Sequence, residues 1–165
     1  MDDLSIQPLT PESPWQSQIV RDQYQYWGPL TGYSSPALYK TFLGQATYSL
    51  TLPRVLLATT SSALLGSVNL LTQEMTIRPQ YMPWLGQLFV SESHRAKGIG
   101  ARLLDAAISY VGSLGYGQLF LFTSGTLPDF YRKHGWTDVE EVSYLGQERT
   151  IMRFDLRRLA DKASN

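Results

Sequence analysis

The stretch LFVSESHRAKGIG, which spans Leu88–Gly100, joins an apolar run to a helical pattern. The run Trp84–Val90 predicts a strand, and Gly98–Leu114 predict a helix because their apolar residues recur at spacings near 3.6. The first turn of a helix leaves backbone N–H groups without internal partners, and these groups bind anions at the positive end of the helix dipole. Gly98 and Gly100 lack a Cβ, so a phosphate group could approach the backbone closely. The stretch therefore predicts a strand, an anion-binding turn and a helix.

The glycine pattern of this turn is weakly specific when taken alone. Arg95 and Lys97 add positive charge beside it, which favours anion binding. Alternatively, the glycines serve only to let the helix pack closely on the sheet. A dinucleotide-binding turn fits poorly because Leu103 stands where its third glycine would be, and the phosphate loop ending in Gly-Lys-Ser or Gly-Lys-Thr is absent.

The remaining pattern predicts an α/β (α+β) fold with a mixed, mostly antiparallel twisted sheet and a central parallel β-α-β unit. Gln118–Phe122 lacks polar alternation, so it predicts a central strand that is buried on both faces and parallel to Trp84–Val90. The other predicted strands are Arg54–Thr60, Ala63–Leu71, Val139–Tyr144 and Thr150–Leu156. The other predicted helices run from Ser13-Pro14 to Trp27, from Pro36 to Gly44 and over Leu127–His134.

Composition and charge bound the class of protein. The 165 residues, 43% of them hydrophobic, predict a single domain over residues 1–165 with a short frayed tail from about residue 158. The absence of Cys excludes thiol catalysis and Cys-ligated metals, and two His are too few for a His-rich site, so no metal is expected. Basic and acidic residues number 14 each, and this zero net charge argues against binding to nucleic acid or an anionic membrane. With neither a signal pattern nor a run of about 20 apolar residues, a cytoplasmic protein is expected.

Three features of the sequence, in order and spacing, resemble the GNAT-type N-acetyltransferase superfamily. The turn fits its Q/R-x-x-G-x-G/A signature at Arg95, Gly98 and Gly100, and Val90–Arg95 is similar to the strand end before it. Downstream, Asp129–Trp136 looks like the superfamily's F-Y-x-x-x-G-F/W element. The resemblance covers about residues 54–156, and shorter pieces are similar to a bacterial group largely without assigned substrates. It implies the acyl-CoA N-acyltransferase (GNAT) fold and acetyl-coenzyme A (acetyl-CoA) as the cofactor.

The resemblance also implies how acetyl-CoA would be held between the two parallel strands. Backbone groups of Leu88 and Val90 would pair with the pantetheine amides, as in strand addition. A backbone N–H at Phe89 or Val90 would polarise the thioester carbonyl. The amides of Ala96–Gly100 would cap the pyrophosphate. The implied cofactor-binding residues are Leu88, Phe89, Val90, Arg95, Ala96, Lys97, Gly98, Ile99, Gly100, Ser124 and Tyr131.

The implied chemistry is direct attack of an amine on the thioester. Tyr131 occupies the position of the family's general acid; alternatively, it is a tyrosine packed on the sheet. Many members place a carboxylate on the strand before the turn, but this chain has Gly86 and Gln87 there, and neither can take a proton. Glu74, which precedes the strand, is the candidate base.

The resemblance places the acceptor site at the loops after the first helix and before Trp84. Its candidate residues are Tyr26, Trp27, Tyr33, Arg78 and Trp84, with the aromatic rings suited to an apolar or cationic amine and Arg78 to an acidic one. Alternatively, these rings pack in the core. We expect an N-acetyltransferase that acts in a ternary complex, as a monomer or homodimer, on a primary amine of a small molecule or of a peptide or protein N-terminus. The alternatives are a catalytically weak acyl-CoA-binding or sensor domain, and an enzyme that uses another acyl chain or a hydroxyl acceptor.

Overall fold

The computed structural model describes residues 3–157, which form two compact units. The first unit holds residues 3–70 and 87–107, and the second holds residues 71–86 and 108–157. Three elements contribute residues to both units, namely β3 (Leu64–Leu71), β4 (Trp84–Val90) and α3 (Ile99–Ser113). The other elements are β1 (Ser5–Pro8), α1 (Gln16–Trp27), η1 (Gly28–Thr31), α2 (Pro36–Ala46), β2 (Arg54–Thr59), η2 (Glu92–His94), β5 (Gln118–Thr123), α4 (Leu127–Lys133), β6 (Thr137–Tyr144) and β7 (Gln147–Asp155). Within the described range no helix has the length and apolar character needed to cross a membrane.

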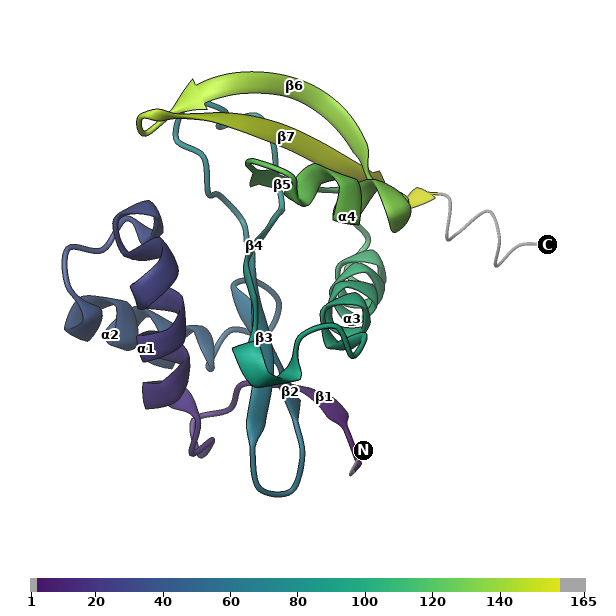
Figure 1. Ribbon diagram of the computed structural model, residues 1–165. Coiled ribbons are helices and arrows are strands. Elements are labelled where there is room, and N and C mark those ends of the chain that lie inside the picture. The colour runs from purple at the N-terminus through teal and green to yellow at the C-terminus, as the bar shows by residue number, and fades with distance from the viewer. Residues whose placement is uncertain (1–2, 158–165) are drawn as a thin grey trace. The chain divides into compact units, whose positions relative to one another are not determined.

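In the first unit, helices cover both faces of the antiparallel strands β1, β2 and β3. The helices α1 and α2 lie on one side of the β2–β3 hairpin and α3 begins on the other (Figure 1). Alternate strand residues point to opposite faces, so Val55 and Leu57 of β2 share a core with Ile19 of α1 and Leu43 of α2. On the opposite face Gly66 of β3 lies so close to α3 that a Cβ there would be 3.1 Å from a methyl of Leu103.

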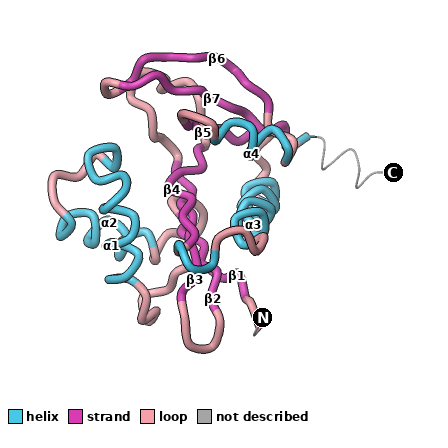
Figure 2. The backbone as a smooth tube through the Cα atoms, viewed as in Figure 1, coloured by secondary structure: helices cyan, strands magenta, loops and turns pink. Residues whose placement is uncertain are grey.

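The second unit is built on β5, β7 and β6, which pair antiparallel in that order. The start of β4 pairs with β5 in parallel, with Trp84 opposite Phe120. The loop over residues 72–83 reaches the β6–β7 hairpin (Figure 2). There the hydroxyl of Tyr144 accepts a hydrogen bond from the backbone N–H of Thr76. The core of this unit consists of Met75, Trp84, Phe120 and Ile151, all of which are buried.

The strand order β1-β2-β3-β4-β5-β7-β6 confirms the predicted mixed, mostly antiparallel sheet. The parallel β4–α3–β5 unit and its bounds are confirmed to within one residue. Gly115 has a φ of +92°, as expected for the left-handed residue that ends α3. The predicted tail from about residue 158 lies outside the described residues.

Two local predictions were inaccurate. The first helix begins at Gln16 and not at Ser13-Pro14, because Trp15 takes the N-cap position without a side-chain cap. The second helix does begin as predicted, since Ser35 Oγ accepts a hydrogen bond of 3.2 Å from the backbone N–H of Leu38. The last hairpin is longer than predicted, because β6 begins at Thr137 and β7 at Gln147.

Candidate active site

The turn between β4 and α3 in the first unit presents open backbone. Ala96 and Gly98 adopt left-handed conformations, with φ of +63° and +78°, and residues 95–98 are exposed. A left-handed alanine is uncommon, and such residues often cluster at functional sites. A Cβ built on Gly98 would meet no atom within 4 Å apart from its chain neighbours. No side chain of a residue beyond its chain neighbours therefore fills the space directly over Gly98.

The amide groups that open α3 complete this turn. The first helical hydrogen bond runs from the N–H of Arg102 to the carbonyl of Gly98 at 3.1 Å. The amides of residues 99–101 lie ahead of that bond, at the positive end of the helix dipole. Lys97 is exposed beside them and adds positive charge. Residues 96–101 thus have the exposed backbone and first-turn amides that were expected from the sequence, and their binding of an anion stays a prediction.

Side-chain and backbone bonds hold the segment that precedes the turn. The N–H of Ser91 donates to the carbonyl of Leu65 on β3 at 2.8 Å, and Ser91 Oγ lies 2.7 Å from Nδ1 of His94. Arg95 Nε donates to the carbonyl of Val90 at 3.0 Å. These contacts fix the turn to the end of β4 and keep the Arg95 guanidinium next to it.

A polar network that the sequence pattern did not predict holds Gln87 within β4. Gln87 has a φ of +49°, a left-handed conformation in the middle of a strand. Its Oε1 accepts a hydrogen bond of 3.3 Å from Asn69 Nδ2, which also donates to Tyr39 and Gln23. Gln23 Nε2 donates in turn to Asn69 Oδ1 at 2.9 Å and to Ser67 Oγ at 3.2 Å. The buried Gln23, on an apolar helix face, was the signal in the sequence that could have revealed this network.

Three aromatic rings gather where α1 ends against β4. The ring centroids of Tyr26 and Phe89 are 5.4 Å apart, and those of Trp27 and Phe89 are 6.5 Å apart in an edge-to-face arrangement. Tyr26 is 53% exposed, so one face of this cluster is open to solvent. The structure thus brings Tyr26 and Trp27, which are predicted to bind the acceptor amine, into contact with Phe89, which is predicted to bind acetyl-CoA.

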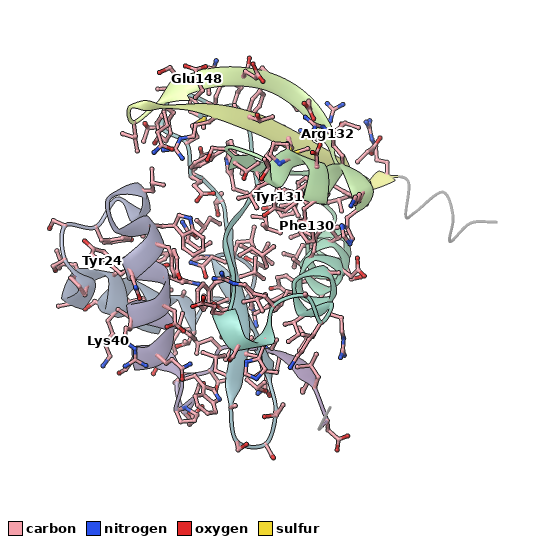
Figure 3. The ribbon with its side chains drawn as sticks, in the orientation of Figure 1. Tyr24, Lys40, Phe130, Tyr131, Arg132 and Glu148 are labelled. Carbon is pink, nitrogen blue, oxygen red and sulfur yellow. The ribbon has the colours of Figure 1, made fainter. Side chains whose placement is uncertain are left out.

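In the second unit, α4 directs three successive side chains to different surroundings (Figure 3). Tyr131 is 8% exposed, and its ring packs edge-to-face on Trp136 at 6.0 Å. Arg132 makes a bidentate pair with Asp138 of β6, at 2.9 and 2.7 Å. The ring of Phe130 packs on that of His134, with 4.7 Å between the ring centroids. The Arg132 pair fastens α4 to the sheet and so fixes the backbone that carries Tyr131.

The hydroxyl of Tyr131 is held in its neutral form. Burial raises the pKa of Tyr131 to about 12, and the negative charge of Glu74 contributes further to the rise. The phenol is consequently protonated at neutral pH and can donate a hydrogen bond. Its pKa lies well above that of a thiol, about 8.5. The neutral phenol can therefore stabilise a thiolate by donating a hydrogen bond. If it gave up its proton, the resulting phenolate would be a strong base and would take a proton back at once.

We expect the raised pKa to appear as a pH dependence of stability. Because folding favours the neutral phenol, this contribution is fully present below the ordinary pKa of 10 and is lost as the pH rises from 10 to 12. The free energy of unfolding of the wild-type chain should fall by about 2–3 kcal/mol more than that of Tyr131→Phe across this window. Urea titrations of both proteins at about pH 9 and pH 12 measure the difference. Parallel curves would show that the hydroxyl is not buried in solution.

Three of the predicted acceptor residues pack in a core or pair with another side chain, and their role in acceptor binding stays a prediction. Trp84 is 0% exposed in the core of the second unit, with Nε1 donating to the carbonyl of Tyr81. Tyr33 stacks on Phe42 at 5.1 Å and packs against the core of the first unit.

Arg78 is the third of these residues. Its guanidinium is paired with Glu140 of β6, so an acidic acceptor would have to compete with that carboxylate. Ser124 lies one residue beyond β5 and is half-buried. Its contact with acetyl-CoA stays a prediction.

The chain is similar to known acetyltransferases in sequence pattern and in fold. A family model described as "Acetyltransferase (GNAT) domain" matches residues 53–138, just over half of the sequence. No curated protein matches the sequence. The fold is similar to an aminoglycoside 6'-N-acetyltransferase solved with coenzyme A, at a TM-score of 0.72 and 16% identity over 92% of this chain and 97% of that one.

Two further solved structures show the same likeness of fold. A GNAT-family acetyltransferase from Streptococcus pneumoniae has a TM-score of 0.68 and 18% identity, over 92% of this chain and 98% of that one. A spermidine N-acetyltransferase chimera from Vibrio cholerae and hSSAT has a TM-score of 0.70 and 16% identity, over 96% of this chain and 98% of that one. At these identities the likeness concerns the fold.

Proposed function

Because this chain belongs to the GNAT family of acetyltransferases, we propose that it transfers the acetyl group of acetyl-CoA to a primary amine by direct attack in a ternary complex. The observation that carries the proposal is the open turn between β4 and α3. Its left-handed residues 96 and 98, its exposed backbone and the first-turn amides of α3 suit a diphosphate. Arg95 and Lys97 supply the cationic charge that such a ligand requires.

The donor's pantetheine arm would lie along β4, with backbone groups of Leu88 and Val90 pairing with its amides. One feature supports this placement: residues 87–90 are only half-buried. An N–H at Phe89 or Val90 would polarise the thioester carbonyl, and Ser124 would add a polar contact near the end of β5.

Tyr131 acts as the acid in this proposal. The amine nitrogen bonds to the carbonyl carbon, the C–S bond breaks, and the sulfur takes the phenol proton. Because the pKa of Tyr131 is about 12, the phenolate recovers a proton from the new amide nitrogen and does not persist. The net products are the acetylated amine, free coenzyme A and one proton from the ammonium form of the acceptor.

The aromatic cluster of Tyr26, Trp27 and Phe89 provides the acceptor wall. Aromatic faces bind both apolar groups and cations, so a hydrophobic or cationic amine suits this wall. The neutralised Arg78 no longer favours an acidic acceptor.

Calorimetric titration with acetyl-CoA, followed by a panel of amines and peptides read by thiol release, tests the proposal. We expect donor binding and release of coenzyme A with at least one primary amine. Donor binding without release across the panel would instead identify a binding or sensor domain. Absence of binding would overturn the proposal.

A further inference from the structure

Gly86 is an unexpected residue for its position in β4. Glycine weakens a strand interior and usually marks a bulge or a close approach by another group. Gly86 is not among the glycines with positive φ, so its backbone conformation is open to any residue. It is also buried, so a side chain here would contribute to packing. A close approach by another group would account for a glycine here.

The group that approaches Gly86 is the carboxylate of Glu74. A Cβ built on Gly86 would lie 2.5 Å from Oε1, 2.8 Å from Oε2 and 3.0 Å from Cδ of Glu74. Real Cβ atoms essentially never come this close to another atom. The carboxylate therefore occupies the position that a side chain of this strand would otherwise take, although it comes from the loop before the strand.

The loop that carries Glu74 is fixed on both sides of this residue. Met75 is fully buried in the core of the second unit. Its carbonyl accepts a hydrogen bond of 3.0 Å from the N–H of Arg78, whose guanidinium is paired with Glu140. Thr76 bonds to the hydroxyl of Tyr144. The carboxylate is thus a positioned group and not the end of an exposed side chain, and its Oε2 is shielded from solvent.

Glu74 and Tyr131 belong to the same unit and interact electrostatically, since the carboxylate is one of the two causes of the raised pKa of Tyr131. The neutral phenol can donate a proton, and the carboxylate can accept one. Neither Gly86 nor Gln87 of β4 can accept a proton.

We propose that Glu74 is the general base of the acetyl transfer, supplied from the loop in the place of a strand side chain at Gly86. The assignment rests on the proposed function. The carboxylate takes one proton from the acceptor ammonium, and the neutral amine then forms the C–N bond. Once the products leave, Glu74 releases that proton to solvent, which balances the overall reaction.

The first test replaces Glu74 by Gln, which keeps the shape of the side chain but cannot take the proton. With the best amine of the panel, kcat at neutral pH should fall by about 100-fold or more, with unchanged affinity for acetyl-CoA. The loss should shrink as the pH approaches the pKa of the amine, because the amine then deprotonates without help. It should also be smaller for an α-amine of pKa near 8 than for a lysine-type amine near 10.4. A merely structural role would lower the rate equally at every pH and for both amines.

The second test moves the carboxylate onto the strand. The double variant Glu74→Ala/Gly86→Glu should have a kcat at least about tenfold higher than that of Glu74→Ala. The double variant Glu74→Ala/Gly86→Gln should show no such gain. Gly86→Ala should lower kcat in the wild-type background, because its Cβ displaces the carboxylate. The same substitution should have little effect on the Glu74→Ala background.

The outcomes separate this assignment from the proposed function. If the wild-type chain acetylates an amine and Glu74→Gln keeps its rate and pH profile, Glu74 is not the base, while the acetyltransferase proposal stands. If the wild-type chain binds acetyl-CoA but acetylates no amine, both proposals are overturned. Thermal melting of each variant identifies any loss of activity that is caused by unfolding. If the variant with Gly86→Glu does not fold, Gly86→Gln with Glu74 intact still tests whether displacement of the Glu74 carboxylate lowers kcat.

Discussion

Replacement of Gly98 by Val should raise the Kd for acetyl-CoA by about 100-fold or more, which corresponds to about 2.7 kcal/mol. A β-branched residue is strained at a φ of +78°, so the turn would leave the conformation that presents its amides. The new side chain would also stand in the space over the turn that other side chains leave open. Isothermal titration calorimetry with acetyl-CoA measures the change.

Gly146 offers a matched control for this substitution. It lies between β6 and β7, has a φ of +80°, and a Cβ there would likewise meet no atom within 4 Å. Gly146→Val should therefore lose about as much stability as Gly98→Val, roughly 1–3 kcal/mol, while it binds acetyl-CoA normally. Intact donor affinity in Gly98→Val would contradict the role of the turn.

Replacement of Tyr131 by Phe should lower kcat by about 100-fold to 10,000-fold, with the Kd for acetyl-CoA nearly unchanged. The ring would still pack on Trp136, so the substitution removes only the hydroxyl that faces the leaving sulfur in our proposal. Because the pKa of Tyr131 is about 12, the wild-type rate should not fall through loss of this proton until the pH is well above 10. Steady-state kinetics across the pH range, with calorimetry for the donor, test both points.

Tyr116→Phe provides the comparison for this change. Tyr116 is half-buried between α3 and β5 and takes no part in the proposed chemistry, so its hydroxyl should be dispensable. If Tyr131→Phe and Tyr116→Phe have the same kcat as the wild-type chain, Tyr131 is a packing residue and the acid must be sought elsewhere.

The β4–α3–β5 unit could be predicted because every signal for it is local. Apolar periodicity marks α3, unbroken apolar runs mark the two strands, and glycine punctuates the turns. The glycine-containing turn between β4 and α3 follows from the same local rules. The start of α1 could not be predicted this way, because the hydroxyl of Ser13 faces the N–H of Trp15 at 3.4 Å and does not cap the helix.

The rest of the candidate site depends on contacts that are distant along the chain. No sequence rule relates Glu74 to Gly86, or Arg78 to Glu140, yet these pairs decide which carboxylate is available and whether the arginine is free to bind an anion. The burial of Trp84 could not be predicted for a related reason. The alternation of a strand predicts two faces, but it does not tell which of them another layer covers.

The network around Asn69 has a consequence for protein engineering. The side chain of Gln87 accepts a hydrogen bond from Asn69 of β3, which bonds in turn to Gln23 of α1 and Tyr39 of α2. A chimera that imports residues 16–46 from another protein, in order to change acceptor preference, would therefore also replace two partners of the residue that contacts the strand proposed to hold the donor. Such grafts should transfer the residues at positions 67 and 69 together with both helices.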